Sequence, residues 1–228
     1  MNGTTTETTG TRIERRPLAS RRWRLSIALA GWLARRGVTP NAISQFGLGA
    51  GLLGGLSLWL TSRSSAPWFL WLLAAGLVQL RLLCNLIDGM VAIESGKGSR
   101  LGELYNEIPD RVSDAATLVG LGFAAGSVPW PGFLAAILAV FVAYVRAAVK
   151  IAGAPQDYSG PMAKPHRMFV VTVTALACAA VPMSLQTAWL DHDWGFPAIA
   201  LVIIIVGCFV TAVRRLVRAA RILEASTP

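Results

Sequence analysis

Six apolar runs, each about as long as a bilayer is thick, constrain the fold of this chain most strongly. They cover residues 41–61, 67–94, 101–126, 132–151, 168–185 and 196–216. Since 54% of the 228 residues are hydrophobic and only 14% are charged, the chain has too little polar surface for a soluble globule of its size. The sequence therefore predicts an all-α integral membrane protein with six transmembrane helices in one domain.

The segments outside these runs divide the chain into four parts. Residues 1–17 lack an apolar period, so we expect a disordered basic N-terminus there. Residues 18–36 mix tryptophan, isoleucine and leucine with arginines, which predicts an amphipathic helix lying in the headgroup region. Residues 37–223 are expected to form the six-helix membrane domain, and residues 224–228 a short tail.

The first run and the connection before it contain helix-breaking and small residues. Pro40 is expected to end the amphipathic helix, and Asn41 to cap the helix that follows. Gly47, Gly51 and Gly55 repeat every four residues, a small-residue ridge that lets another helix approach closely. This glycine ridge fits packing within one subunit and fits a homodimer equally well.

Lysine and arginine are concentrated in alternate connections. They precede the first run and follow the second, the fourth and the sixth, whereas the other connections carry one arginine or none. Positively charged loops face the cytoplasm, so the sequence predicts a multi-pass protein of the inner (cytoplasmic) membrane with both termini on the cytoplasmic side. Because the basic charge does not form one continuous patch, the net charge of +9 does not indicate nucleic-acid binding.

Carboxylates and amides of the membrane domain gather in residues 85–114, NLIDGMVAIESGKGSRLGELYNEIPDRVSD, at the cytoplasmic side. Spacings of three and four residues put them on one face of each of two helices. These faces carry Asn85, Asp88 and Ala92, and Gly102, Asn106, Asp110 and Asp114. An ionised Asp at the bilayer centre costs about 2.5–3.5 kcal/mol, which argues against a lipid-facing position. The sequence predicts a polar cavity between the two helices.

Hard oxygen ligands that converge from two helices suit Mg²⁺ or Mn²⁺, ions that neutralise phosphate groups. Gly89 and Ala92 lie beside Asp88 and leave space where a bulky ligand could lie against the backbone. These features favour a phosphorylated ligand. The alternative is that the aspartates are solvated or pair with nearby arginines, which would be Arg81, Arg100 and Arg111.

The same stretch resembles a known signature. NLIDGMVA followed by GELYNEIPD is similar to DxxDGxxAR, eight or nine residues, then GxxxDxxxD, the signature of the CDP-alcohol phosphotransferase (phosphatidyltransferase) family. The eight residues 94–101 match the spacing. The TPN sequence at 39–41 and the six-run layout also look like this family. The identical positions are Asp88, Gly89, Ala92, Gly102 and Asp110.

The resemblance implies a membrane enzyme of phospholipid synthesis that transfers the phosphatidyl group of a CDP-alcohol, typically CDP-diacylglycerol, to an acceptor alcohol with release of CMP. It implies that Mg²⁺ or Mn²⁺ binds the early acidic positions and that Asp110 acts as the base or as a further ligand. Gly89 and Ala92 would line the cytidine pocket. Thr39 and Asn41 would belong to the same donor site.

Three positions depart from the family pattern. Asn85 and Asn106 stand where the family has aspartates, and Ile93 replaces its arginine. An Asn offers a carbonyl oxygen but no charge, so Asn85 and Asn106 would be weaker metal ligands and would give two divalent ions less support. Asp114, one turn further along, could supply part of the missing charge as a metal ligand, whereas Arg81 would bring a cation near the metal position.

These departures leave three outcomes open. The protein is an active enzyme with a one-metal or remodelled site, an enzyme with altered donor chemistry, or a weakened relative that binds a lipid or nucleotide-lipid without turnover. A transporter that uses the same carboxylates is a further class, but transporters usually place such groups at the midplane on interrupted helices. The expected partners are the CDP-alcohol donor, the acceptor alcohol, membrane lipids and a second copy of the chain.

Basic residues near the fourth and fifth runs form a second candidate group. Arg146 falls within an apolar run, where it must snorkel or pair. Members of the family that this chain resembles have basic residues at these positions, which hold the phosphate of an acceptor. We therefore expect an anion pocket opposite Asp110 that holds a phosphorylated acceptor. Its residues are Arg146, Lys150, Lys164 and Arg167. The alternative is that these are ordinary positive-inside charges. Anionic headgroups are expected at Arg214, Arg215 and Arg218.

Overall fold

The computed structural model describes residues 24–94, 100–155, 157–187 and 194–226. Within these residues the chain forms helices and no strand, which confirms the all-α prediction. The expected N-terminal segment 1–17 and residues 227–228 of the predicted tail lie outside the described part. The elements are α1 (Arg24–Arg35), α2 (Pro40–Leu60), the 3₁₀ turn η2 (Thr61–Arg63), α3 (Pro67–Glu94), α4 (Arg100–Gly122), α5 (Pro129–Ile151), α6 (Lys164–Ala180), α7 (Met183–Thr187) and α8 (Phe196–Ser226).

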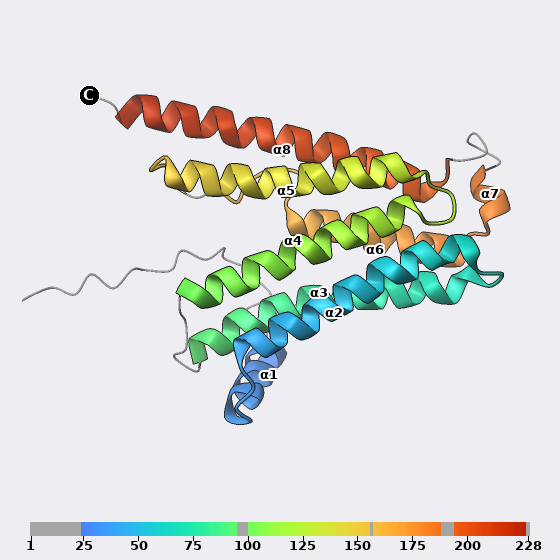
Figure 1. The fold of residues 1–228 in the computed structure, drawn as a ribbon, viewed down its shortest axis with the longest axis horizontal. Helices are drawn as coiled ribbons and strands as arrows, with labels where there is room; N and C mark the ends of the chain where they lie inside the picture. Colours follow the sequence, from blue (N-terminus) through green and yellow to red (C-terminus); the bar gives the residue numbers. More distant parts are fainter. Residues whose placement is uncertain (1–23, 95–99, 156, 188–193, 227–228) are drawn as a thin grey trace, which may run out of the picture.

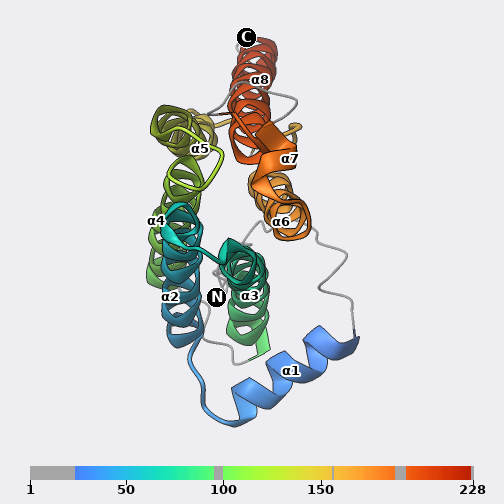
Figure 2. The same cartoon turned by 90° about the vertical axis from the view of Figure 1, so that its right-hand side faces the viewer.

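The long helices lie side by side, and α1 lies across them at one end of the bundle (Figure 1; Figure 2). In the described part, α6 has only 17 residues, and α4 carries Asp110 and Asp114 of the polar stretch. Among the described residues, four segments are long and apolar enough to cross a membrane, namely Pro40–Arg63, Pro67–Glu94, Pro129–Ile151 and Phe196–Ala225. The chain is therefore an integral membrane protein.

The predicted runs and the helices agree closely in number and order, but the ends of α4, α5, α6 and α8 are shifted by three residues or more. The run 101–126 corresponds to α4, which ends earlier, at Gly122. The run 168–185 corresponds to α6, which starts at Lys164 because a proline fits its first turn. The last helix continues beyond the sixth run through an arginine-rich segment.

The corner between α1 and α2 corrects the roles predicted for Pro40 and Asn41. Gly37 ends α1, since its φ is +75° and its N–H and that of the next residue donate to carbonyls in the last turn of α1. Thr39 caps α2, because its hydroxyl accepts a backbone hydrogen bond of 3.2 Å. Pro40 takes the first helical position, where no N–H is needed. The proline thus begins a helix instead of ending one. Asn41 is exposed in the first turn of α2 and is not the capping residue.

The glycine ridge of α2 packs against both α3 and α4. A Cβ on Gly47 would lie 2.8 Å from the Cβ of Cys84 on α3, and one on Gly51 would lie 2.5 Å from the Cβ of Ser113 on α4. These distances are too short for a side chain, so glycine is what allows the helices to approach. The ridge therefore serves packing within the subunit, and a homodimer stays a prediction.

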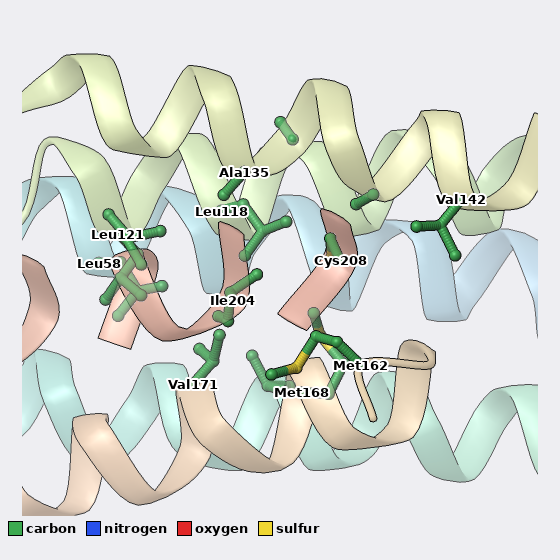
Figure 3. Close-up of a cluster of buried hydrophobic side chains, with 14 of the residues drawn as sticks. Leu58, Leu118, Leu121, Ala135, Val142, Met162, Met168, Val171, Ile204 and Cys208 are labelled. Carbon is green, nitrogen blue, oxygen red and sulfur yellow. The ribbon is translucent and has the colours of Figure 1, made fainter. Parts of the chain in front are cut away.

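The apolar core draws on α2, α3, α4, α5, α6 and α8 (Figure 3). On α4 the core residues Leu118 and Leu121 follow the polar residues Asp110 and Asp114, so the helix is polar in its first half and apolar in its second. Leu118 and Leu121 are fully buried, and because lipid tails are as apolar as leucine, their burial stabilises the fold through close packing between helices. The core fixes the helices whose polar ends carry the site.

Candidate active site

The polar stretch lies at the ends of two antiparallel helices. α3 carries Asn85 and Asp88 near its C-terminus, and α4 carries Asn106 and Asp110 near its N-terminus. α2 packs against both helices, and α6 packs against α3. The structure thus brings the two predicted faces together, but many of their polar groups are bonded to one another and to basic residues.

Asp110 is the centre of this arrangement and is buried. Its Oδ1 forms an ion pair with the Arg81 guanidinium and lies 2.7 Å from Nζ of Lys164 on α6. Its Oδ2 accepts a hydrogen bond of 2.9 Å from Nδ2 of Asn85. Three side chains from two other helices therefore orient this carboxylate.

Arg81 is a functional residue whose full role the sequence did not reveal. Its side chain is 3% exposed, and it joins α3 to α4 through Asp110 and through a 3.0 Å hydrogen bond from Nε to Oγ of Ser113. Its Nη1 donates at 3.0 Å to Oδ1 of Asn85. Gly47 makes room for it, since a Cβ there would lie 2.8 Å from Nη1. The sequence left open whether the aspartates are solvated or pair with nearby arginines. At Asp110 the structure shows pairing, with Arg81.

Asp114 forms a second ion pair, with Arg167 on α6. Nη2 of Arg167 lies 2.6 Å from Oδ2 of Asp114, and Nη1 donates at 3.0 Å to the carbonyl of Met162. Nζ of Lys164 lies 4.0 Å from the other oxygen of Asp114. Both Asp114 and Arg167 are almost wholly buried, so the described contacts of Asp114 are with cations of the protein itself.

One oxygen of Asp88 has no hydrogen-bond partner among the described residues. Oγ of Ser44 on α2 donates at 2.7 Å to its Oδ2, whereas Oδ1 is buried and accepts no hydrogen bond from the described residues. Oδ1 of Asn106 is also buried and unpartnered among them. Ser44 was missed at the sequence level, although it precedes Gly47 by three residues and so continues the glycine ridge toward the site.

The charges of the central cluster balance. Three carboxylates, Asp88, Asp110 and Asp114, face three cations, Arg81, Lys164 and Arg167. Charges buried at low dielectric attract and repel strongly, so a balanced cluster is stable without further ions. Any added cation needs an added anion.

The oxygens Asp88 Oδ1 and Asn106 Oδ1, both buried and without a partner in the part of the chain that the structure describes, fit a divalent cation that prefers oxygen ligands. Within the described residues, no three His, Cys, Asp or Glu side chains gather closely enough to hold a metal by themselves. An ion at Asp88 and Asn106 would therefore complete its coordination with water and with the phosphates of a substrate, a common arrangement for Mg²⁺.

The residues assigned to the donor lie at two places. Gly89 and Ala92 are buried on α3 beside Asp88. Thr39 caps α2, and Asn41 is exposed in its first turn. Ile93, at the position of the family's arginine, points outward and is 65% exposed.

The residues assigned to the acceptor separate into three positions. Lys164 and Arg167 belong to the aspartate cluster. Arg146 pairs with Glu107 on α4, which Arg111 also contacts, and its guanidinium lies 5.5 Å from the ring centre of Tyr158. Lys150 is exposed at the end of α5, and no polar contact of the described residues joins it to the other three.

Arg215 differs from the other arginines that follow the sixth run. It is buried, and it donates at 3.0 Å to the carbonyl of Ser159 and at 3.2 Å to that of Val142. Its expected contact with headgroups is therefore wrong, because the guanidinium ties α8 to α5 and to the loop before α6. Arg214 and Arg218 stay exposed on α8.

A model of the family described as CDP-alcohol phosphatidyltransferase matches residues 37–213. The chain is 29% identical over 170 residues to inner membrane protein YnbA of Escherichia coli, covering 75% of this chain and 82% of that protein. It is also 29% identical over 158 residues to phosphatidylinositol phosphate synthase of Mycolicibacterium smegmatis, covering 67% of this chain and 68% of that enzyme.

Solved structures show the same fold. The phosphatidylinositol phosphate synthase of Mycobacterium tuberculosis with CDP-DAG bound superposes with a TM-score of 0.66 at 22% identity, covering 86% of this chain and 94% of that one. The same enzyme in complex with manganese and citrate gives a TM-score of 0.66 at 22% identity, covering 85% and 88%.

Proposed function

The chain belongs to the CDP-alcohol phosphatidyltransferase family, and from that premise we propose that it transfers the phosphatidyl group of a CDP-alcohol, such as CDP-diacylglycerol, to an acceptor alcohol. The observation that carries the proposal is the pairing of the NLID end of α3 with the NEIPD start of α4 through Asn85 and Asp110. This contact brings both halves of the family signature into one site.

In the proposed reaction the acceptor hydroxyl oxygen attacks the phosphorus that bears the diacylglycerol. The bond between this phosphorus and the CMP oxygen breaks, and CMP leaves. Asp110 takes the hydroxyl proton, since it stands at the position of the family's base and three side chains from α3 and α6 hold its carboxylate in place.

Asp88 and Asn106 would hold a divalent cation, Mg²⁺ or Mn²⁺, through their Oδ1 atoms, which lack a hydrogen-bond partner among the residues described. When bound, the cation would neutralise charge on the donor's diphosphate. Ser44 fixes the Asp88 carboxylate by its hydrogen bond, so that the free oxygen is presented for binding. Gly89 and Ala92, which are small and buried on α3, would line the position of the cytidine.

Lys164 and Arg146 are the proposed contacts for a phosphorylated acceptor. Lys164 forms an ion pair with Asp110 directly. Arg146, on α5, is partly exposed and pairs with Glu107, which lies on α4 as Asp110 does. Arg167 acts at one remove, because it positions Asp114. Lys150, which is exposed at the rim, would attract the anion from a distance.

The proposed membrane arrangement has six spans, with both termini and the site on the cytoplasmic side. α6 is short, but it exposes an apolar stripe at Phe169, Val173 and Leu176, as a lipid-facing helix does. α1 exposes Leu25 and Trp32 and lies across the bundle (Figure 2), which supports a position at the headgroups.

The direct test is release of CMP from CDP-diacylglycerol by the purified protein in detergent or nanodiscs, with Mg²⁺ or Mn²⁺ and a panel of free and phosphorylated alcohols. We expect release that depends on both the cation and an acceptor. Donor binding without release for any acceptor would overturn the transferase proposal and favour a binding role.

A further inference from the structure

We propose that the guanidinium of Arg81 is a built-in cation between Asn85 and Asp110, so that the site takes a single divalent ion, at Asp88 and Asn106. This inference rests on the proposed function, because it concerns the ions that would serve the same transfer. It explains why Asn85 stands where the family has an aspartate, because Arg81, Asn85 and Asp110 form one contact network.

The position of Arg81 is fixed from three sides. Its guanidinium pairs with Asp110 and donates at 3.0 Å to both Asn85 Oδ1 and Ser113 Oγ. The residue is 2% exposed, so the charge cannot move out into water. The missing side chain at Gly47 leaves the room that Nη1 occupies. A cation therefore already lies on the carboxylate of Asp110.

Asn85 suits this neighbour better than an aspartate would. Its Oδ1 accepts from Arg81 while its Nδ2 donates at 2.9 Å to Asp110. A carboxylate in its place would lack the donor and would face the carboxylate of Asp110. An amide between a guanidinium and a carboxylate satisfies both, so Asn85 and Arg81 act as one unit.

The open oxygens lie one helical turn away from this unit. Arg81 bonds to Ser113, and Asn85 bonds to Asp110, which sets the register of the antiparallel helices α3 and α4. The next turn toward the connecting segment carries Asp88 on α3 and Asn106 on α4. Both have a buried side-chain oxygen without a partner among the described residues, and Asp88 is 2% exposed.

Charge limits the number of ions. The three carboxylates Asp88, Asp110 and Asp114 already balance Arg81, Lys164 and Arg167. Among the three, Asp88 has a buried oxygen without a hydrogen-bond partner in the described residues. One divalent ion at Asp88 adds two positive charges to this neutral cluster, and the diphosphate of the bound donor can balance them. A second ion beside Asp110 would lie against the guanidinium, and like charges repel strongly where water is excluded.

The test counts Mn²⁺ ions per chain in the full-length protein in nanodiscs with CDP-diacylglycerol, by electron paramagnetic resonance of free Mn²⁺ and by elemental analysis. The wild type is expected to bind one ion, and N85D alone also one, since Arg81 is still present. The double variant R81M/N85D is expected to bind two, with the spin coupling of a close Mn²⁺ pair.

A control, R63M/Q45E, makes the same change of net charge away from the cluster and should leave the count at one; Gln45 is exposed and Arg63 lies at the opposite end of α2. Two ions or none in the wild type, two in N85D, or one in a folded double variant would overturn the inference. Should the double variant fail to fold, the wild-type and N85D counts still decide. Because CMP release is a separate readout, failure of the transferase proposal would be told apart from an incorrect ion count.

Discussion

Nδ2 of Asn85 donates a 2.9 Å hydrogen bond to Oδ2 of Asp110, and this contact links the two halves of the signature across antiparallel helices. The same carboxylate is held by Arg81 and Lys164. Asn85, which stands where the family has an aspartate, is thus a neutral bridge between Arg81 and the proposed base, Asp110. The predictions below test the parts of this arrangement separately.

Ser44 should tune metal affinity without contacting the metal. S44A removes the 2.7 Å hydrogen bond to Asp88 Oδ2 and should weaken Mn²⁺ binding about 10- to 100-fold, as loss of a partner behind a ligand typically does. The matched control is S57A on the same helix, because Ser57 donates to the backbone carbonyl of Leu53 instead. Equal Mn²⁺ titrations for S44A and S57A would show that Asp88 needs no support from α2.

Arg167 should be structural. R167M leaves Asp114 buried without its partner and should lower the free energy of unfolding by about 3–5 kcal/mol, measured as thermal unfolding in detergent. R218M is the control, since Arg218 is largely exposed and lies 3.6 Å from Asp157. The double variant R167M/D114L should recover part of the loss. A wild-type melting temperature for R167M would refute this role.

Replacing the basic residues proposed for the acceptor should weaken acceptor binding more at the two partly buried positions than at the exposed one. K164A and R146A should each raise the acceptor KM about 10- to 100-fold, the effect of losing a charge-assisted hydrogen bond, with little change in the KM for CDP-diacylglycerol. K150A should have a smaller effect, because Lys150 is exposed. If K164A and R146A change the donor KM and leave the acceptor KM alone, these residues serve the donor instead.

The glycine ridge should be intolerant at its contact positions and tolerant beside them. G51A puts a Cβ 2.5 Å from the Cβ of Ser113 and should destabilise the protein by about 1–3 kcal/mol. G49A is the control, since nothing lies within 4 Å of its added Cβ. Equal thermal stability of the two variants would contradict the packing of α2 on α4.

Most of the fold could be predicted from the sequence, because apolar run length and helix period are local properties. The run 67–94 corresponds to α3 at both ends. The cap was mispredicted because Asn41 and Thr39 are both good capping residues, and only the location of Pro40 at the first helical position decides between them. The end of α1 was also mispredicted, because Gly37 ends this helix and Pro40 does not.

The location of the site could be predicted from the sequence, but the contacts between its side chains could not. The signature placed Asp88 and Asp110 in one site, and the position of Arg81 one turn before Asn85 indicated a nearby cation. Which oxygen each cation takes depends on the register of α3 against α4 and on how α6 docks, and these follow from long-range packing. The contact of Ser44 with Asp88 and the burial of Arg167 also depend on long-range packing, so the sequence did not predict them.

The measurement that tests the central claim most directly compares wild type and D110N for CMP release from CDP-diacylglycerol, with Mn²⁺ and a panel of acceptor alcohols. The account predicts release by the wild type and a loss of about 10²- to 10⁴-fold in D110N, while D157N, which alters an aspartate in the loop before α6, keeps the wild-type rate. Undiminished release by D110N, or no release by the wild type with any acceptor while the donor still binds, would contradict it.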